Sequence, residues 1–260
     1  MNTFDSLRSL SMSGLVLILL FTSSISYSAK IIFDLGEVLL HQRGIRSYSH
    51  IISIVGPLNI AKYYYNNKSL IAAYYRIFQF GDIVLKQDCR NAWFAGQITN
   101  QELIAIISEN IYKEEYSSFF KNKSERNLIA TGIYLLLPEN ILKITNLDQE
   151  GFKIVKKCAE LGHELFILSN WDAVSIELIK NKFPELFNLF KPENVIISGH
   201  HKKAKPDLQA FKIVIKDNNP SDYYFIDDLQ ENIDAANSLG INGILHKDWK
   251  STMKLLSHLF

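Results

Sequence analysis

The sequence predicts an α/β protein in which a Rossmann-like parallel sheet has helices on both faces and a helical cap inserted after its first strand. First, the apolar run 31–33 leads directly into Asp34 and a turn at Gly36, as expected at the carboxyl end of a buried strand. Second, helical and strand patterns alternate from about residue 148 onward, which is typical of a parallel sheet. Third, residues 45–145 show helical periodicity and almost no strand pattern, which indicates an insertion.

Each predicted element follows from a local pattern. Strands are expected at 164–168, 194–197, 223–226 and 241–245, and helices at 151–161, 173–183, 207–216, 231–239 and 249–259. In the insertion, helical spacing predicts a helix over 69–80, and Thr99 with Glu102 forms a capping box that opens another. Pro138 is expected to end a third helix. The predicted domains are a core of residues 29–43 plus 147–260 and a cap of residues 44–146.

Residues 1–28 have the order of regions found in a secretory signal peptide. A polar stretch with Arg8 is followed by the apolar run 14–21 and then by small polar residues. We expect cleavage after Ser28 and export to the periplasm or the outside of the cell. An uncleaved anchor formed by residues 14–21 is the alternative, although a membrane-spanning helix needs about 20 residues. No later stretch is apolar enough to predict a membrane span after signal removal.

The charge balance gives no reason to expect a nucleic-acid partner. The formal net charge is +1, and the loss of residues 1–28 leaves it unchanged because Asp5 and Arg8 are removed together. A nearly neutral chain lacks the basic surface that attracts nucleic acid or anionic membranes. Cys89 and Cys158 fall in different predicted domains and are expected to be buried free thiols. The sequence does not indicate an oligomeric state.

Polar residues stand at or shortly after the ends of four predicted strands. In chain order they are Asp34, Ser169, Asn170, Lys205, Asp227 and Asp228. Each of them alone is an ordinary turn residue or helix cap. Because the carboxyl ends of parallel strands open onto one crevice, we expect these side chains to converge there.

The converging residue types suit phosphoryl transfer. Asp34 can act as a carboxylate nucleophile. Ser169 and the backbone of Asn170 can hold an anionic oxygen, while Lys205 balances negative charge. Asp227 and Asp228 can join Asp34 around a hard cation such as Mg²⁺, which prefers oxygen ligands. Positioning and charge neutralisation of this kind supply most of the catalysis in phosphoryl transfer.

Four segments resemble the motifs of the haloacid dehalogenase-like hydrolase superfamily. They are 33–39 (FDLGEVL), 167–170 (ILSN), 198–207 (SGHHKKAKPD) and 225–236 (FIDDLQENIDAA). The long gap between the first two suits a phosphatase-like member with a helical cap of the C1 type. Residues 96–102 (GQITNQE) also resemble a phrase common in such caps. The four motifs together are specific for the superfamily but not for a substrate.

The resemblance implies a role for each site residue. Asp34 would attack phosphorus and form an aspartyl-phosphate, while Ser169 and Lys205 bind the phosphoryl group. Mg²⁺ would be held by Asp34, the Gly36 carbonyl group and Asp228, with Asp227 binding directly or through water.

One position departs from the usual pattern of such phosphatases, which carry a second aspartate as general acid and base where this chain has Gly36. The neighbouring Glu37, water or the substrate would then supply the proton. His41 lies a few residues further on and is a candidate for the mouth of the crevice, although a polar residue in a connector is exposed by default.

The sequence thus predicts an exported, Mg²⁺-dependent phosphatase of small phosphomonoesters such as sugar phosphates. A 2-haloacid dehalogenase is one alternative, in which Asp34 would attack carbon without a metal. A non-catalytic binding or effector-like protein on the same scaffold is another, because the usual acid is missing. In this arrangement the cap residues determine which substrate binds, so the sequence does not identify the substrate.

Overall fold

The structure is a computed structural model that describes residues 28–42, 68–120 and 123–260. Most of the predicted signal peptide, residues 1–27, lies outside the described residues, and so does the segment 43–67 of the predicted cap. Export and the cap boundaries therefore stay predictions. Among the helices that the structure describes, none is long and apolar enough to cross a membrane.

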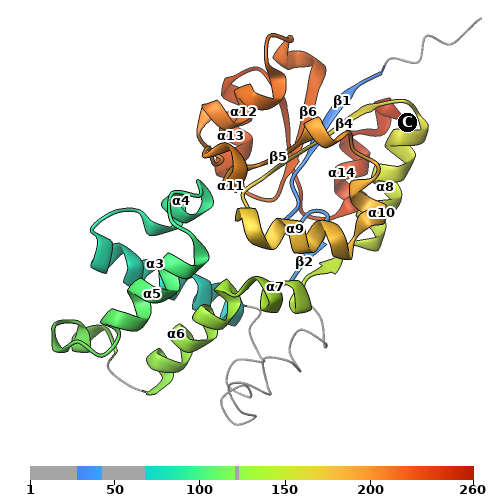
Figure 1. The fold of residues 1–260 in the computed structure, drawn as a ribbon. Helices are drawn as coiled ribbons and strands as arrows, with labels where there is room; N and C mark the ends of the chain where they lie inside the picture. The colour runs from blue at the N-terminus through green and yellow to red at the C-terminus, as the bar shows by residue number, and fades with distance from the viewer. Residues whose placement is uncertain (1–27, 43–67, 121–122) are drawn as a thin grey trace, which may run out of the picture.

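Five parallel strands form the central sheet in the order β5-β4-β1-β6-β7 (Figure 1). They are β1 (Lys30–Phe33), β4 (Glu164–Ser169), β5 (Val195–Ile197), β6 (Tyr223–Asp227) and β7 (Asn242–Leu245). Phe33, the last residue of β1, pairs with Ile167 on one side and with Ile226 on the other. This register brings the carboxyl ends of the three central strands to one edge, and the predicted fold class is confirmed.

Alternate residues of β1 face two separate hydrophobic clusters, because side chains along a strand point in turn to opposite faces. Ile31 and Phe33 belong to a cluster formed with helices α8 (Gln149–Glu160), α9 (Ala173–Lys182) and α14 (Trp249–Leu255). Ile32 belongs to a cluster formed with α12 (Leu208–Ile215) and α13 (Gln230–Ser238). The sheet is therefore covered on both faces, as the alternating pattern predicts.

Four helices of the sheet domain begin at an aspartate whose carboxylate accepts backbone N–H groups of the first turn. These caps are Asp148 at α8, Asp172 at α9, Asp207 at α12 and Asp248 at α14. The first N–H groups of a helix have no partner within the helix, so such caps fix where each helix starts. The remaining short elements are α10 (Pro184–Phe187), α11 (Ser198–His201), η2 (Pro192–Asn194), η3 (Pro220–Asp222) and η4 (Ser257–Leu259).

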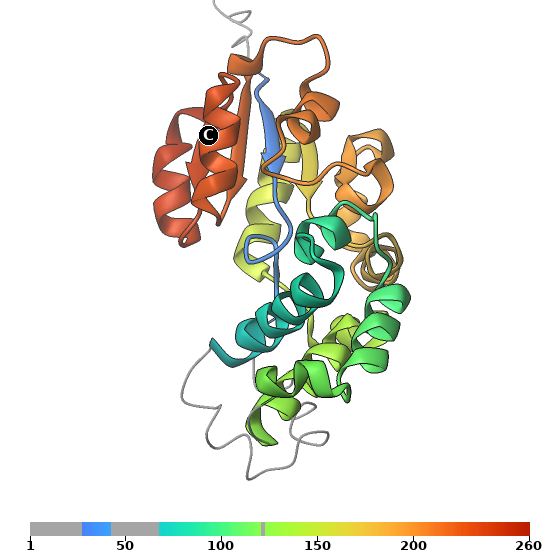
Figure 2. The ribbon, with the colours of Figure 1, turned by 90° about the vertical axis from the view of Figure 1, so that its left-hand side faces the viewer.

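The helices inserted after β1 have a core of their own. They are α3 (Lys68–Leu85), α4 (Cys89–Phe94), α5 (Asn100–Asn110), η1 (Glu114–Phe119) and α6 (Lys123–Leu136). Aromatic rings fill this core, where Phe80 lies against Phe119 and Phe120. The capping box of Thr99 and Glu102 is present at the start of α5. Figure 2 shows these helices at one end of the sheet domain.

Two short strands connect the insertion to the sheet domain. They are β2 (Leu40–His41) and β3 (Asn146–Leu147), which pair in antiparallel fashion. Just before β3 lies α7 (Pro138–Ile144), whose first residue is the proline predicted to end a helix. Ile141 of α7 packs in the cluster of the sheet domain, and the Lys182 ammonium of α9 donates to the carbonyl groups of Leu142 and Thr145. By packing, α7 belongs with the sheet domain, although its sequence lies within the predicted cap.

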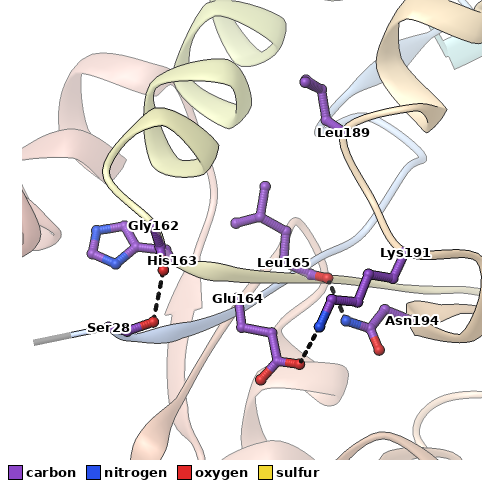
Figure 3. A pocket seen from close by; sticks show the side chains of 8 residues that line it. All are labelled: Ser28, Gly162, His163, Glu164, Leu165, Leu189, Lys191 and Asn194. Atoms are coloured by element: carbon purple, nitrogen blue, oxygen red, sulfur yellow. Dashed lines mark hydrogen bonds and ion pairs between the residues drawn. The ribbon is translucent and has the colours of Figure 1, made fainter.

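The amino edge of the sheet, opposite the strand ends that carry the site, holds a small open pocket (Figure 3). Its polar groups are bonded within the protein: the Ser28 hydroxyl donates to the Gly162 carbonyl group, and Glu164 pairs with Lys191. The next residue, Ala29, is fully buried and its backbone N–H donates to His163 Nδ1. Cleavage after Ser28 would place a charged amino group at this buried position, which is costly.

Candidate active site

Asp34 and Lys205 form the centre of the site at the carboxyl edge of the sheet. Asp34 follows β1 directly, its backbone N–H donates to the Ile226 carbonyl group, and its Oδ1 accepts from the Leu35 N–H. The Lys205 ammonium lies 2.9 Å from Asp34 Oδ1 and 2.6 Å from Asp227 Oδ2. Asp34 is 7% exposed and Lys205 is 3% exposed, so these ion pairs are buried. The sheet thus brings together residues that are almost two hundred positions apart in sequence.

Asp227 is the most fully bonded carboxylate of the site. Besides Lys205, it accepts from the Leu229 backbone N–H at 2.8 Å and from Asn232 Nδ2 at 3.0 and 3.1 Å. Asn232 is buried in the first turns of α13, and the sequence interpretation gave it no role. The sequence pattern that could identify Asn232 is its position as a polar residue on the same face of α13 as the buried Ile233 and Ala236. Asn232 thus contacts both oxygens of Asp227, of which Oδ2 also bonds Lys205.

Asp34, Asp227 and Asp228 each offer a carboxylate oxygen, and these oxygens lie within 4.8 Å of one another. Three carboxylates face one ammonium group, that of Lys205, so the cluster carries a surplus of two negative charges when all four groups are ionised. A divalent cation would balance this surplus. The donor atoms are all oxygens, which Mg²⁺ prefers. The residues present therefore fit the magnesium site that the sequence predicts.

The charges of the cluster shift the pKa values of its members. Burial, reinforced by the charges of Asp34 and Asp227, raises the pKa of Asp228 to about 7. Burial also raises the pKa of Asp34, against the attraction of Lys205. Burial alone would lower the pKa of Lys205, but Asp227 and Asp34 outweigh it and the pKa is raised. Lys205 therefore stays charged, and the carboxylates are crowded with negative charge that a cation would relieve.

Ser169 and Asn170 lie at the end of β4 and have different surroundings. The Ser169 side chain is buried beside the Asp34 carboxylate and acts to lower the pKa of Asp34. The Asn170 side chain donates to the Lys205 carbonyl group and accepts from the Lys205 N–H, both at 2.8 Å. The amide of Asn170 thus holds the backbone of Lys205 in place. A phosphate-binding role for Asn170 would fall to its backbone, as the sequence interpretation has it.

Gly36 and Glu37 form the turn that follows Asp34. A β-carbon added at Gly36 would meet no atom within 4 Å, and the positive φ of this turn, 54°, falls at Glu37 instead. The conformation of the backbone therefore does not demand glycine at position 36. The Glu37 carboxylate lies 3.9 Å from His41 Nδ1, and the other ring nitrogen of His41 bonds Asp148. The acid next to Gly36 is thus directed toward His41.

The inserted helices reach the site through the loop that precedes Lys205. Helix α11 lies beside α4 of the insertion, and the Lys202 ammonium donates to the Gly96 carbonyl group at 2.5 Å (Figure 1). The backbones of Gly96 and Gly199 approach each other closely. A β-carbon at Gly96 would lie only 2.7 Å from the Gly199 carbonyl oxygen. The insertion therefore contacts the sheet domain at Lys202, which lies three residues before Lys205 in the sequence.

Solved structures have a similar overall fold. A HAD family enzyme from Bacteroides thetaiotaomicron, in complex with magnesium and inorganic phosphate, is 24% identical with a TM-score of 0.52, and the match covers 86% of this chain and 98% of that one. The chain has the fold of the HAD-like hydrolases. The putative HAD-hydrolase YfnB from Bacillus subtilis, bound to magnesium, is 15% identical with a TM-score of 0.52 and coverages of 88% and 99%.

Other comparisons leave the activity within the HAD-like fold open. A solved dehalogenase is also similar, at 15% identity and a TM-score of 0.50, over 84% of each chain. Among curated proteins, a drimenol cyclase from Aspergillus calidoustus is 26% identical over 149 residues, 56% of this chain. The chain spans 28% of the length of that relative. No protein-family model matches the chain.

Proposed function

We propose that this protein is a Mg²⁺-dependent phosphatase that uses Asp34 as its nucleophile on small phosphomonoesters such as sugar phosphates. The observation that carries the proposal is the buried cluster in which Lys205 bridges Asp34 and Asp227 beside Asp228. Its surplus of two negative charges suits a divalent cation, and its ammonium suits a phosphoryl group. The magnesium and phosphate bound by the similar Bacteroides enzyme support the same chemistry.

Each residue then has a definite task. Asp34, held by Leu35 N–H and Lys205, attacks phosphorus to form an aspartyl-phosphate, and the electron pair of the broken P–O bond goes to the leaving oxygen. Water then attacks the same phosphorus, the bond to the Asp34 oxygen breaks, and inorganic phosphate and the free carboxylate result. In this proposal Lys205, Ser169 and the Asn170 backbone hold the phosphoryl oxygens. Asp34, the Gly36 carbonyl group and Asp228 would hold Mg²⁺, with Asp227 bound directly or through water. When bound there, Mg²⁺ would reduce the electrostatic repulsion between the Asp34 carboxylate and the negatively charged phosphate.

The dehalogenase alternative has less support from the site. A carboxylate attacking carbon that carries a halide needs no cation, whereas the three clustered carboxylates make up a strongly anionic site. The solved dehalogenase among the similar structures supports this alternative only through its fold.

One substrate panel distinguishes the possibilities. Purified protein is assayed with p-nitrophenyl phosphate, several sugar phosphates and 2-chloropropionate, each in Mg²⁺ and in EDTA, with the Asp34→Asn variant as control. We expect phosphate release that requires Mg²⁺ and disappears in the variant. Metal-independent chloride release would replace the proposal with a dehalogenase, and no turnover of any compound would favour a binding protein.

A further inference from the structure

Glu37, His41 and Asp148 form a row of side chains that connects three segments beside the proposed site. Glu37 belongs to the turn after Asp34, His41 to strand β2, and Asp148 caps helix α8 by accepting from the Gly151 N–H at 2.6 Å. His41 Nε2 bonds the Asp148 carboxylate, and His41 Nδ1 lies 3.9 Å from Glu37 Oε2. The row therefore links the turn after Asp34 to the two short strands β2 and β3, because His41 lies in β2 and Asp148 directly follows β3.

The bond to Asp148 determines which nitrogen of a neutral His41 carries the proton. A carboxylate accepts hydrogen bonds, so Nε2 must donate, and Nδ1 of the neutral ring then has only a lone pair. That lone pair faces a carboxylate oxygen of Glu37, which is unfavourable. When His41 is protonated, Nδ1 also carries a proton and attracts Glu37. The contact between Nδ1 and Glu37 is therefore attractive only when both ring nitrogens of His41 carry a proton.

The turn that Glu37 occupies is demanding for an ordinary residue. Glu37 has a φ of 54°, and its N–H donates to the Leu40 carbonyl group while the Leu40 N–H donates to the Leu35 carbonyl group. A non-glycine residue in this left-handed region costs about 1 kcal/mol or more and persists only when its surroundings hold it there. The ion pair with His41 is one contact that holds it. The same turn presents Asp34 and the Gly36 carbonyl group.

We propose that His41, oriented by Asp148, is a positioning residue that in its protonated form holds Glu37 and thereby the Asp34–Gly36 turn in its cation-binding conformation. This inference rests on the proposed function. The charged and titratable groups that face His41 are Glu37 from the turn, Asp148 from α8 and His246 from the loop after β7. His246 is tied to Thr252 through Nδ1 and has its pKa lowered, chiefly by burial, so it does not compete for the carboxylates.

The test compares Mg²⁺ binding at two pH values, read as the Mg²⁺ concentration that gives half of the rise in melting temperature. At pH 6, His41→Gln should need about tenfold to a hundredfold more Mg²⁺ than wild type, because groups behind metal ligands contribute to affinity to this extent. At pH 9, well above the range in which histidine side chains ordinarily change charge, this difference in Mg²⁺ requirement between the variant and wild type should close. Comparison at equal pH cancels the titration of the ligands themselves.

Three further variants make the result specific. Glu37→Gln keeps the His41–Asp148 bond and removes the negative charge that faces Nδ1, so it should show the same difference from wild type at pH 6. His163→Gln removes a histidine that is bonded through both nitrogens at the far edge of the sheet, and it should show no gap. Asp88→Asn changes an aspartate cap in the insertion and should also leave Mg²⁺ binding unchanged.

The outcomes separate this inference from the proposed function. The positioning role is overturned if either His41→Gln or Glu37→Gln needs no more Mg²⁺ than wild type at pH 6. It is also overturned if the difference from wild type is equal at both pH values. A closing gap supports it even if wild type hydrolyses no phosphate ester, in which case the proposed phosphatase activity fails alone. If hydrolysis of p-nitrophenyl phosphate is observed, its rate at limiting Mg²⁺ should show the same dependence on pH and variant.

Discussion

The sheet domain and the inserted helices place their polar residues in different ways. In the sheet domain, Asp34, Asp227 and Lys205 are buried at strand ends or loops and bonded to one another. In the insertion, the buried polar groups support the helices themselves: Trp93 Nε1 donates to Asn100, whose amide donates to the Leu136 carbonyl group. The first domain holds a charged cluster that folding alone does not require, whereas the second is held together by its own packing.

We therefore propose that the chemistry takes place in the sheet domain and that the insertion selects the substrate. A buried cluster with surplus negative charge is unfavourable unless a ligand balances it. The insertion contacts the sheet domain near the site, where the Lys202 ammonium donates to the Gly96 carbonyl group, and so it can influence what enters without taking part in bond making. The predictions below test this division of roles.

The largest effect is expected from Asp34→Asn. The amide keeps the shape and the hydrogen bond from the Leu35 N–H but is no nucleophile, so turnover should fall by about 10⁴-fold or more. The melting temperature should stay near that of wild type, which is the control for folding. Phosphatase activity retained by a pure Asp34→Asn preparation would falsify the assignment of the nucleophile.

A gain of function is expected from Gly36→Asp. The added side chain has open space and no positive φ to oppose it, and it places a carboxylic acid beside the nucleophile. Sugar phosphates, whose leaving groups need a proton, should be hydrolysed up to about 10²-fold faster, while p-nitrophenyl phosphate should change little.

The matched variant for this test is Glu37→Gln. Because the Glu37 carboxylate is directed toward His41, its loss should affect activated and poor leaving groups equally. A loss confined to sugar phosphates would instead show that Glu37 supplies the proton.

The sequence predicts which polar residues of the sheet domain come together better than it predicts the contacts that support them. Asp34, Ser169 and Asp227 could be placed together because parallel strands in register must end at one edge. Asn232 and the side chain of Asn170 were not assigned their contacts, because hydrogen bonds between loops depend on side-chain positions that no periodic pattern encodes.

The insertion shows the limit of sequence patterns more clearly. Its helices follow from periodicity, and the capping box of Thr99 was found from two residues. Helix α6 ends just before Pro138, as the sequence predicts, but the same proline also opens α7, and the packing of α7 on the sheet domain does not follow from the sequence pattern. A helix with an apolar face carries no sign of which neighbour will cover it.

Removal of metal should make the sheet domain sensitive to pH through Asp228. Its pKa is about 7 in the folded protein and about 3.9 in an unfolded chain, so the folded state holds the proton over this interval. Because the unfolded state binds fewer protons there, stability in EDTA should fall as the pH rises from 4 to 7. Mg²⁺ should restore it at pH 8.

The variant Asp228→Asn checks this assignment by calorimetry in EDTA and in Mg²⁺. The amide cannot ionise, so the variant should lose less stability than wild type between pH 4.5 and 8 in EDTA and should gain little from Mg²⁺. Its Mg²⁺ requirement for turnover should rise by about tenfold or more. Identical pH dependence and identical Mg²⁺ response in the two proteins would exclude Asp228 from the cation site.

The smallest effect is expected where the two regions meet. Lys202→Met keeps most of the side chain but removes the exposed hydrogen bond to Gly96, a contact of about 1 kcal/mol. If this contact helps to hold the insertion over the crevice, KM for a sugar phosphate should rise by about twofold to fivefold, as that energy allows. kcat should change little, because Lys202 touches none of the reacting groups. Lys203→Met is the matched control, since Lys203 pairs with Asp207 within the sheet domain. An equal rise in KM for both variants would mean that general surface charge, and not the contact between the regions, is responsible.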